Sequence, residues 1–244
     1  MFLDMIEIQD GAIFISDAHD NALRSGFYKF LQKIDLGEIK TTQIFLMGDM
    51  LDLLIGEISY LSQKHHKYIE LIDRIASKIE LFYFEGNHDF LLKSLFKNAK
   101  IIDIQSQPLT CRVKDKKILL SHGDKYGDFE HNLYTKIIRS RFLLKFLNFI
   151  DIICTSCISK RILSNLQEKN ICRTIENFED KIEHKISNYS HKEIDIIAEG
   201  HYHQDKVFEI DNIKYINFPS FACNQSYIIV QLFPEIKFKR GYDV

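Results

Sequence analysis

The 244-residue chain has little proline, no marked net charge and no long hydrophobic run. Three prolines, with no serine- or glycine-rich tract, argue against linkers and disordered tails, so we expect one domain spanning residues 1–244. A formal net charge of −2 gives no overall attraction to nucleic acid, and we expect no nucleic-acid partner. With 45% hydrophobic residues, the chain can nevertheless bury a large core.

A secretory signal and a disulfide framework are also missing. The first residues carry acids where a signal peptide needs positive charge, and no long apolar segment follows, so we expect a cytoplasmic protein. The cysteines are odd in number and lack framework spacing; they are Cys111, Cys154, Cys157, Cys172 and Cys223. The single CxxC, at 154–157, has no second pair for zinc and no preceding βαβ pattern for redox chemistry. We expect buried or lipid-facing thiols in a reducing compartment.

Short apolar runs that stop at a glycine and polar residues recur along the chain. The clearest is at residues 81–84, which lead into Glu85-Gly86 and then Asn87-His88-Asp89. This pattern is typical of a parallel strand that enters an active-site loop. Similar runs at 12–15, 43–47, 117–120 and 195–198 are followed by polar loops, which contain Asp17, His19, Asp49, His122, His201 and His203.

The remaining pattern indicates an α/β fold with a helical insertion. Helical periodicity predicts helices at 26–34 and 61–78 and a short helix at 90–96. Asp10-Gly11 is a hairpin-type turn signal, and closing antiparallel strands are expected at 207–210, 213–217 and 227–232. Residues 126–191 show no strand pattern, so we interpret them as a long helical insertion.

The polar loops predict a centre for two metal ions. In open α/β sheets the residues beyond the carboxyl ends of the strands meet in one crevice. The loops supply seven oxygen or imidazole ligands and no thiolate, which is enough for two ions that share one ligand. Asp49, alone on its loop, is the best bridging residue. The mixture favours Mn²⁺, with Fe or Zn²⁺ as alternatives, over Ca²⁺ or a structural zinc.

Each motif taken alone has a simpler interpretation. A single histidine at a strand end is more often a hydrogen-bonded structural residue, and an aspartate after a strand is often a helix cap or turn former. However, five of the ten histidines lie in these loops, each beside an aspartate, an asparagine or a glycine. Coincidence across five separate segments is a poor explanation.

As a set, these motifs resemble the five-block signature of the calcineurin-like metallophosphoesterases. The blocks occur in the family's order; they are Asp17-Ala18-His19, Gly48-Asp49, Gly86-Asn87-His88-Asp89, Ser121-His122-Gly123-Asp124 and Gly200-His201-Tyr202-His203. The resemblance implies an α/β/β/α sandwich and a dinuclear phosphoester hydrolase. It also implies that Asp17, His19, Asp49 and His203 hold the first metal, and that Asp49, Asn87, His122 and His201 hold the second.

A narrower resemblance is to the UDP-2,3-diacylglucosamine diphosphatases of the lipid A pathway. It depends on the blocks at 48–56 and 86–92 and on the helical insertion after residue 124. It implies release of lipid X and UMP, with the insertion as a lid. We expect substrate contacts from Glu130, Lys169 and Arg173. The chain departs from this family at His88, where those enzymes typically have arginine, and at Glu199, where histidine is often found.

His88 and Asp89 are the expected catalytic residues. A non-ligand imidazole at this position can neutralise phosphoryl charge or protonate the leaving oxygen, and Asp89 beside it could fix its tautomer. Metal ions at such a site activate a water for attack on phosphorus.

Residues 139–163 are the most apolar stretch, but Lys145 and Asp151 interrupt it and it falls short of the ~20 apolar residues of a spanning helix. Basic residues flank it, which suits an interfacial element at anionic headgroups; they are Arg139, Arg141, Lys160 and Arg161. We therefore expect a lid that holds acyl chains and a peripheral position on the cytoplasmic face of the inner membrane. The simpler alternative is an internal helix pair.

Two other functions remain open. One is a phosphodiesterase or phosphatase acting on a soluble phosphoester, which His88 favours and the apolar lid disfavours. The other is a non-catalytic metal-binding scaffold, which the complete set of seven ligand positions disfavours.

Overall fold

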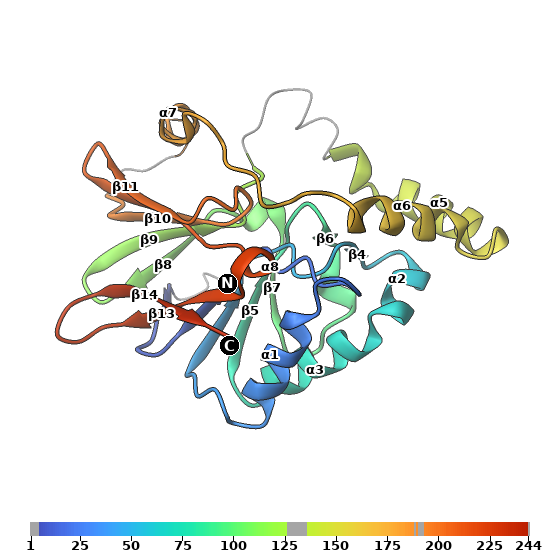
Figure 1. Cartoon of the computed structure of the whole chain (residues 1–244), viewed down its shortest axis with the longest axis horizontal. Coiled ribbons are helices and arrows are strands. Elements are labelled where there is room, and N and C mark those ends of the chain that lie inside the picture. The colour runs from blue at the N-terminus through green and yellow to red at the C-terminus, as the bar shows by residue number, and fades with distance from the viewer. Residues whose placement is uncertain (1–4, 126–135, 188, 190–192, 244) are drawn as a thin grey trace.

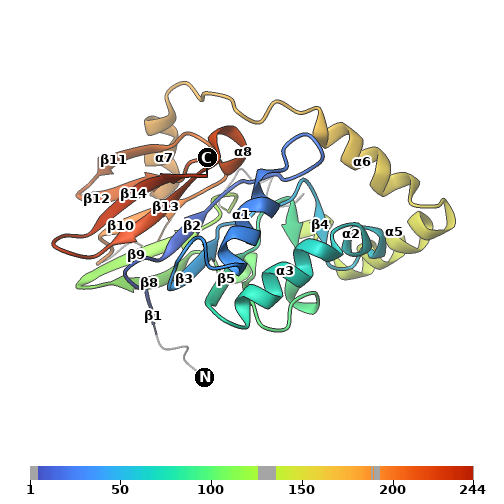
Figure 2. The same ribbon diagram turned by 60° about the horizontal axis from the view of Figure 1, so that its bottom comes forward.

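The computed structural model describes residues 5–125, 136–187, 189 and 193–243. Two six-stranded sheets pack face to face, and helices cover both outer faces (Figures 1 and 2). The expected α/β/β/α sandwich is therefore confirmed.

The first sheet has the strand order β1-β8-β9-β10-β12-β11. Its central strands β9, β10 and β12 are parallel, while β8 and β11 pair antiparallel at either side. In chain order the bounds are β1 Ile6–Glu7, β8 Leu109–Val113, β9 Lys116–Ser121, β10 Ile196–Glu199, β11 Lys206–Ile210 and β12 Ile213–Asn217.

The second sheet has the order β14-β13-β2-β3-β5-β7. Strands β2, β3, β5 and β7 are parallel, and β13 and β14 close the sheet in antiparallel fashion. The bounds are β2 Ile13–Ile15, β3 Gln43–Leu46, β5 Glu80–Phe84, β7 Lys100–Ile102, β13 Ser226–Gln231 and β14 Lys237–Tyr242. A separate parallel pair joins β4 (Leu54–Ile55) to β6 (Asp89–Phe90).

The core between the sheets is rich in phenylalanine. Phe14, Phe45 and Phe82 come from adjacent strands of the second sheet, and their rings stack at centroid distances of 4.4 and 4.9 Å. Phe218, which directly follows β12 of the first sheet, stacks on Phe14 at a centroid distance of 5.3 Å. All four rings are almost fully buried. Buried aromatic pairs add about 0.5–1.5 kcal/mol beyond their area burial, so this stack contributes to the packing of one sheet on the other.

The outer helices follow the predicted amphipathic pattern. Helices α1 (Gly26–Asp35), α2 (Ser59–Lys64) and α3 (His66–Ala76) cover the second sheet. Helix α7 (Phe178–Ile186) covers the first sheet through buried Phe178, Ile182 and Ile186. The helix expected at 61–78 is broken at His65, which caps α2 and precedes α3.

Other local expectations were wrong. Asp10-Gly11 does not close a hairpin, because β1 pairs with β8 of the first sheet while β2 belongs to the second. The helix expected at 90–96 is instead strand β6 followed by a short 3-10 turn, Leu92–Ser94. Another 3-10 turn spans Ile104–Ser106. The parallel pairing of β6 with β4 consumes the residues that would have begun the helix.

The described part of the insertion contains helices and no strand, as expected. Helices α5 (Arg141–Ile153) and α6 (Cys157–Gln167) extend away from the sheets to the right in Figure 1. The Asp151 carboxylate accepts from the N–H groups of Ile158 and Ser159 at 2.9 and 3.0 Å and thereby caps α6. In the part of the chain that the structure describes, no single helix is long and apolar enough to cross a membrane. Helices α5 and α6 reach that length and composition only together, as a pair bent by 100°.

We expected free thiols, but four of the five cysteines form disulfides. Cys154 pairs with Cys157 at the α5–α6 turn, and Cys172 pairs with Cys223 of the short helix α8 (Phe221–Asn224). Cys111 is a buried free thiol, as expected. The second pair joins residues 51 apart in the sequence, so only the folded chain brings them together.

Candidate metal centre

The predicted ligands occupy strained loops at the carboxyl ends of the parallel strands. Five of them have left-handed backbone angles although they are not glycine; φ is +51° at Asp17, +40° at His19, +57° at Asp49, +65° at His201 and +58° at His203. Such conformations cost about 1–3 kcal/mol each and cluster at functional sites, where the surrounding structure holds them. The strain therefore marks these loops as built for a purpose other than stability.

The folded chain brings these loops into three overlapping clusters. Within each one, the candidate ligand atoms lie within 4.8 Å of one another. The clusters are Asp17 with His19 and His203, His19 with Asp49 and His88, and Asp49 with His122 and His201. Asp49 belongs to two clusters, which is the arrangement expected of a bridging carboxylate.

Distances across the clusters are short. Nε2 of His203 lies 3.1 Å from Oδ1 of Asp17, and Oδ2 of Asp49 lies 3.8 Å from Nε2 of His19 and 3.5 Å from Nε2 of His122. Oδ1 of Asn87 lies 3.3 Å from Nε2 of His122. All seven predicted ligands therefore meet at one place.

Backbone carbonyls orient two of the imidazoles. Nδ1 of His122 lies 2.8 Å from the Met47 carbonyl, and Nδ1 of His203 lies 2.7 Å from the Ile171 carbonyl. A carbonyl can only accept, so Nδ1 carries the proton and Nε2 presents its lone pair to the cluster. Fixing the second ring nitrogen in this way is characteristic of metal-binding histidines.

Two glycines leave room for the ligands. A Cβ at Gly86 would lie 2.3 Å from Oδ1 of Asp49, and a Cβ at Gly48 would lie 2.5 Å from Nδ1 of His122. Both distances are far shorter than real contacts, and Gly48 also has φ +91°. Only glycine allows these loops to approach the carboxylate and the imidazole so closely.

The charges of the cluster suit a divalent cation. Burial lowers the pKa of His19 to about 3 and that of His201 well below its usual value. Burial opposes ionisation of Asp17, but His203 outweighs it and lowers the pKa of Asp17 to about 2. The pKa of His122 is raised because Asp49 outweighs burial. Deprotonated carboxylates thus lie beside imidazoles, and a bound cation would take the place of the compensating protons.

Oδ1 of Asp17 supports the same conclusion. It is buried, and Nε2 of His203 lies 3.1 Å away. With the His203 proton on Nδ1, that nitrogen has none to donate, so Oδ1 accepts no hydrogen bond within the described structure. A buried carboxylate oxygen without a donor is costly unless a cation satisfies it. The donor set of carboxylate, amide and imidazole therefore fits two divalent ions, which would activate a water and neutralise phosphoryl charge.

The expected role of Asp89 was wrong. Its Oδ1 accepts from the backbone N–H groups of Asp49 and Gly86 at 2.9 and 2.8 Å. Its Oδ2 accepts from the Met50 N–H and the Tyr83 hydroxyl at 2.8 and 2.7 Å. These donors occupy both oxygens, so Asp89 positions the Asp49 loop instead of His88. Burial, reinforced by Asp49, raises the pKa of Asp89 to about 7.

His88 lines the cavity beside the candidate ligands, and its contact with substrate stays a prediction. It is half-buried, and its ring packs edge-on against His19 at a centroid distance of 4.9 Å. Its Nδ1 lies 2.6 Å from the Asp52 carbonyl, which fixes the tautomer that was expected to depend on Asp89. Its backbone N–H donates to Oδ1 of Asp49 at 2.8 Å.

A cavity of about 310 Å³ opens over the centre. Lys169 and Arg173, both predicted substrate contacts, line it, together with Lys181 of α7. Glu130, the third predicted contact, lies outside the described residues. Lys181 was missed because only the packing of α7 on the first sheet brings it to the cavity. The three cations can attract an anionic substrate toward the metal ligands.

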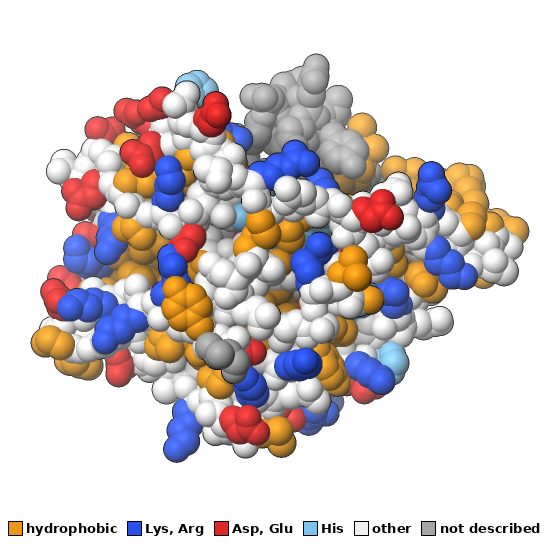
Figure 3. Space-filling view, in the orientation of Figure 1, with side chains coloured by type: hydrophobic (Ala, Val, Ile, Leu, Met, Phe, Trp, Pro, Cys, Tyr) orange, Lys and Arg blue, Asp and Glu red, His pale blue; other side chains and the backbone are white. Residues whose placement is uncertain are grey.

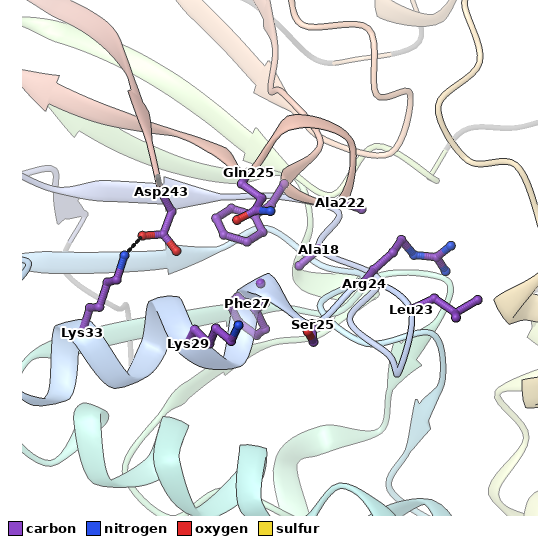
Figure 4. Close-up of a pocket in the computed structure, with 12 residues that line it drawn as sticks. Ala18, Leu23, Arg24, Ser25, Phe27, Lys29, Lys33, Ala222, Gln225 and Asp243 are labelled. Atoms are coloured by element: carbon purple, nitrogen blue, oxygen red, sulfur yellow. Dashed lines mark hydrogen bonds and ion pairs between the residues drawn. The ribbon is translucent and has the colours of Figure 1, made fainter.

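A larger cavity lies elsewhere. It has a volume of about 520 Å³ and lies between α1 and α8 (Figure 4). Lys33 pairs with Asp243 at 2.6 Å on one side of it, and Arg24 pairs with Asp52 at 2.8 Å on the other. No histidine is among the described residues that line it, so it is not the metal site.

Behind the centre lies a buried ion pair that the sequence did not reveal. Nζ of Lys185 donates to Oε2 of Glu199 at 2.8 Å and to the Gly123 carbonyl at 2.7 Å. The Glu199 carboxylate also accepts from Ser121 and Tyr215 at 2.7 and 3.0 Å. The network joins α7 to the loops of His122 and His201.

Comparisons with known proteins identify relatives of this chain. A family model described as calcineurin-like phosphoesterase matches residues 12–205. The UDP-2,3-diacylglucosamine hydrolase of Proteus mirabilis is 21% identical over 206 residues, covering 82% of this chain and 84% of that protein. The corresponding hydrolase of Photorhabdus laumondii is 22% identical over 205 residues, covering 81% and 84%. Among solved structures, an archaeal phosphodiesterase covers 94% of this chain and 98% of its own, at 12% identity and a TM-score of 0.43.

Proposed function

Because the chain belongs to the calcineurin-like phosphoesterase family, and is thus a metal-dependent phosphoesterase, we propose that it hydrolyses the diphosphate bond of UDP-2,3-diacylglucosamine. The products would be UMP and lipid X. The observation that carries the proposal is the near-full-length similarity to hydrolases named for this substrate, which extends across the helical insertion.

The proposed ligands follow the family pattern. Asp17, His19, Asp49 and His203 would hold one ion; Asp49, Asn87, His122 and His201 would hold the other. Mn²⁺ is the proposed metal, with Fe and Zn²⁺ as alternatives, because the ligands combine oxygen and imidazole without thiolate. His88 would contact the transferred phosphoryl group, with its Nδ1 proton held by Asp52.

The cations over the centre support a diphosphate substrate. Lys169, Arg173 and Lys181 line the cavity that contains the ligands, and each is exposed or half-buried. A diphosphate presents one phosphoryl group to the metals and leaves a second negative group to be neutralised nearby. We propose that these three residues bind that second group.

The exposed apolar side chains of helix α5 support the proposal of a lipid substrate. Its exposed large apolar side chains, which form the α5 apolar surface, are Phe142, Phe146, Phe149, Ile152 and Ile153, exposed by 56–86%. Hydrophobic side chains gather in Figure 3 where Figure 1 places α5 and α6. A monomeric soluble protein seldom leaves such a patch uncovered. We propose that this surface enters the lipid layer that holds the acyl chains, on the cytoplasmic face of the inner membrane.

One expected headgroup contact was wrong. Arg139 is largely buried and donates to the Gly86 carbonyl at 2.8 Å, so its guanidinium braces the loop of Asn87. Arg141, Lys160 and Arg161 remain exposed beside α5 and α6 and are the proposed headgroup contacts.

The decisive experiment is a substrate panel with metal-free protein and added Mn²⁺. We expect release of UMP from UDP-2,3-diacylglucosamine that depends on Mn²⁺. If no UMP appears while water-soluble phosphodiesters are hydrolysed well, the lipid substrate is excluded and the alternative of a soluble phosphoester is favoured. If neither is hydrolysed although two ions bind, the protein is a metal-binding scaffold.

A further inference from the structure

Residues 168–177, which connect α6 to α7 and are named the strap here, cross the cavity over the metal centre. The strap contains no helix or strand, and none of its side chains is buried. Only Ile175 packs, partly buried, against the core cluster under α7, so the strap buries little apolar surface. Its conformation therefore depends largely on the few bonds that attach it to the rest of the molecule.

One of these attachments is covalent. The Cys172–Cys223 disulfide joins the middle of the strap to helix α8. Other attachments are hydrogen bonds. The Gln204 side chain bonds the backbone of Arg173 and Ile175 at 2.8 Å each, and Arg24 donates to the carbonyl of Gln167, next to the strap, at 3.4 Å.

Each end of the disulfide lies one residue from a group that contacts a proposed ligand. On the strap, the carbonyl of Ile171 accepts from Nδ1 of His203 at 2.7 Å. On α8, the backbone N–H of Ala222 donates to the Asp17 carbonyl at 3.1 Å. Asp17 and His203 themselves approach to 3.1 Å. The disulfide thus closes a ring of contacts around one half of the metal centre.

We propose that the Cys172–Cys223 disulfide is a positioning element of the first metal site, because it holds the Ile171 carbonyl that fixes the tautomer and direction of His203. The inference rests on the proposed function insofar as Asp17 and His203 are metal ligands. Loss of a group that orients a ligand typically costs about 10–100-fold in metal affinity.

The bridge is also accessible to chemistry. Both Cys172 and Cys223 are exposed, so a dithiol reductant can attack the disulfide. Two electrons and two protons pass from the dithiol to the bridge; two cysteine thiols form, and the dithiol is oxidised to its own disulfide. Reduction would free the strap, with Lys169 and Arg173 on it, and weaken the first metal site reversibly.

The test compares Mn²⁺ binding to metal-free protein by calorimetry in two double variants. Cys172→Ser with Cys223→Ser should bind one of the two ions about tenfold more weakly. Cys154→Ser with Cys157→Ser, which removes the remote disulfide at the α5–α6 turn, should bind both ions as the unaltered protein does. Unchanged affinity in the first variant overturns the inference, and so does alkylation of Cys172 and Cys223 in protein purified without reductant.

Two further measurements separate this inference from its premises. His203→Ala should lose one ion; if it does not, the ligand assignment fails and the inference with it. If His203→Ala loses the ion but Cys172→Ser with Cys223→Ser binds both ions with unchanged affinity, the ligand assignment stands and the inference alone fails. Misfolding of the serine variant is avoided by reducing the Cys154→Ser, Cys157→Ser protein with dithiothreitol and removing the reagent. Its Mn²⁺ affinity should fall about tenfold and recover on reoxidation.

Discussion

The Asp89 carboxylate accepts the backbone N–H groups of Asp49 and Met50 at 2.9 and 2.8 Å. It therefore fixes the backbone that presents the proposed bridging ligand, which has a left-handed φ of +57°. Four donors converge on its two oxygens, so this position suits a side chain whose two oxygens both accept, and a neutral amide would turn an NH₂ group toward some of the donors.

We expect Asp89→Asn to lower kcat for a soluble phosphodiester by about 10–100-fold, the usual effect of losing a group that orients a metal ligand. Tyr83→Phe, which removes one of the four donors, should cost far less. Steady-state kinetics with Mn²⁺ at saturation check both variants. Wild-type turnover in Asp89→Asn would contradict the positioning role.

Metal dependence can be tested on the ligands themselves. Chelation should abolish hydrolysis and Mn²⁺ should restore it. Asn87→Ala or His122→Ala should lower turnover by about a thousandfold, because metal stabilisation of the transition state contributes several kcal/mol. His66, an exposed histidine of α3, gives a matched control, and His66→Ala should be indistinguishable from the unaltered protein.

The Lys185–Glu199 pair should be coupled in stability. Burial opposes both charges, but each partner outweighs it, so the pKa of Lys185 is raised and that of Glu199 is lowered. Lys185→Met leaves a buried carboxylate unpaired and should cost about 3–5 kcal/mol of unfolding free energy in urea. The double variant with Glu199→Gln should cost much less than the sum of the two single variants. Simple additivity would show that the pair contributes no coupling.

His65 predicts how stability changes with pH at a site remote from the metals. It is 5% exposed, and burial lowers its pKa to about 4, whereas its value in the unfolded chain is about 6.5. The folded state disfavours the charged form, so its stabilising contribution is complete above pH 6.5 and is lost as the pH falls toward 4. We expect the unaltered protein to lose about 2 kcal/mol more than His65→Gln between pH 7 and pH 5. Urea unfolding of both proteins at pH 7 and pH 5 measures this change. The same loss of unfolding free energy in both proteins would refute the prediction.

Local motifs were sufficient to predict the centre but not its support. The proximity of Asp49 and His122 could be predicted from the sequence because strand ends converge in any α/β sheet, whatever the details of packing. The role of Asp89 could not be predicted, because its neighbour His88 points to the Asp52 carbonyl and two of its four donors, the N–H groups of Asp49 and Met50, come from another strand end. The α/β class was predictable because apolar runs with polar ends define strands, whereas the α/β/β/α sandwich was implied by the resemblance to the family.

Pairings between distant residues were not predictable. The Cys172–Cys223 disulfide crosses 51 residues, and the Lys185–Glu199 pair forms only when α7 packs on the first sheet. Short strands with mixed composition, such as β7 and β14, were missed because they have no clear alternation. These features depend on tertiary packing, which sequence periodicity does not encode.

The α5 apolar surface gives the sharpest test of the lipid proposal. Phe142, Phe146 and Phe149 are 86, 56 and 61% exposed, so replacing them with serine should change the unfolding free energy by less than about 0.5 kcal/mol each. Because they are proposed to enter the lipid layer, the triple variant should lose binding to vesicles that contain anionic phospholipid, measured by flotation. It should also release UMP from UDP-2,3-diacylglucosamine at least about tenfold more slowly, since burying each aromatic side chain contributes about 1.5–3 kcal/mol. Hydrolysis of a water-soluble phosphodiester should be unchanged, because these residues do not line the cavity over the metal ligands.

Leu144 provides the matched control: it is 4% exposed on the opposite side of α5, so Leu144→Ser should destabilise the helix without a selective effect on the lipid substrate. Equal losses on both substrates in the triple phenylalanine variant would mean that α5 supports the fold of the active site instead of binding lipid.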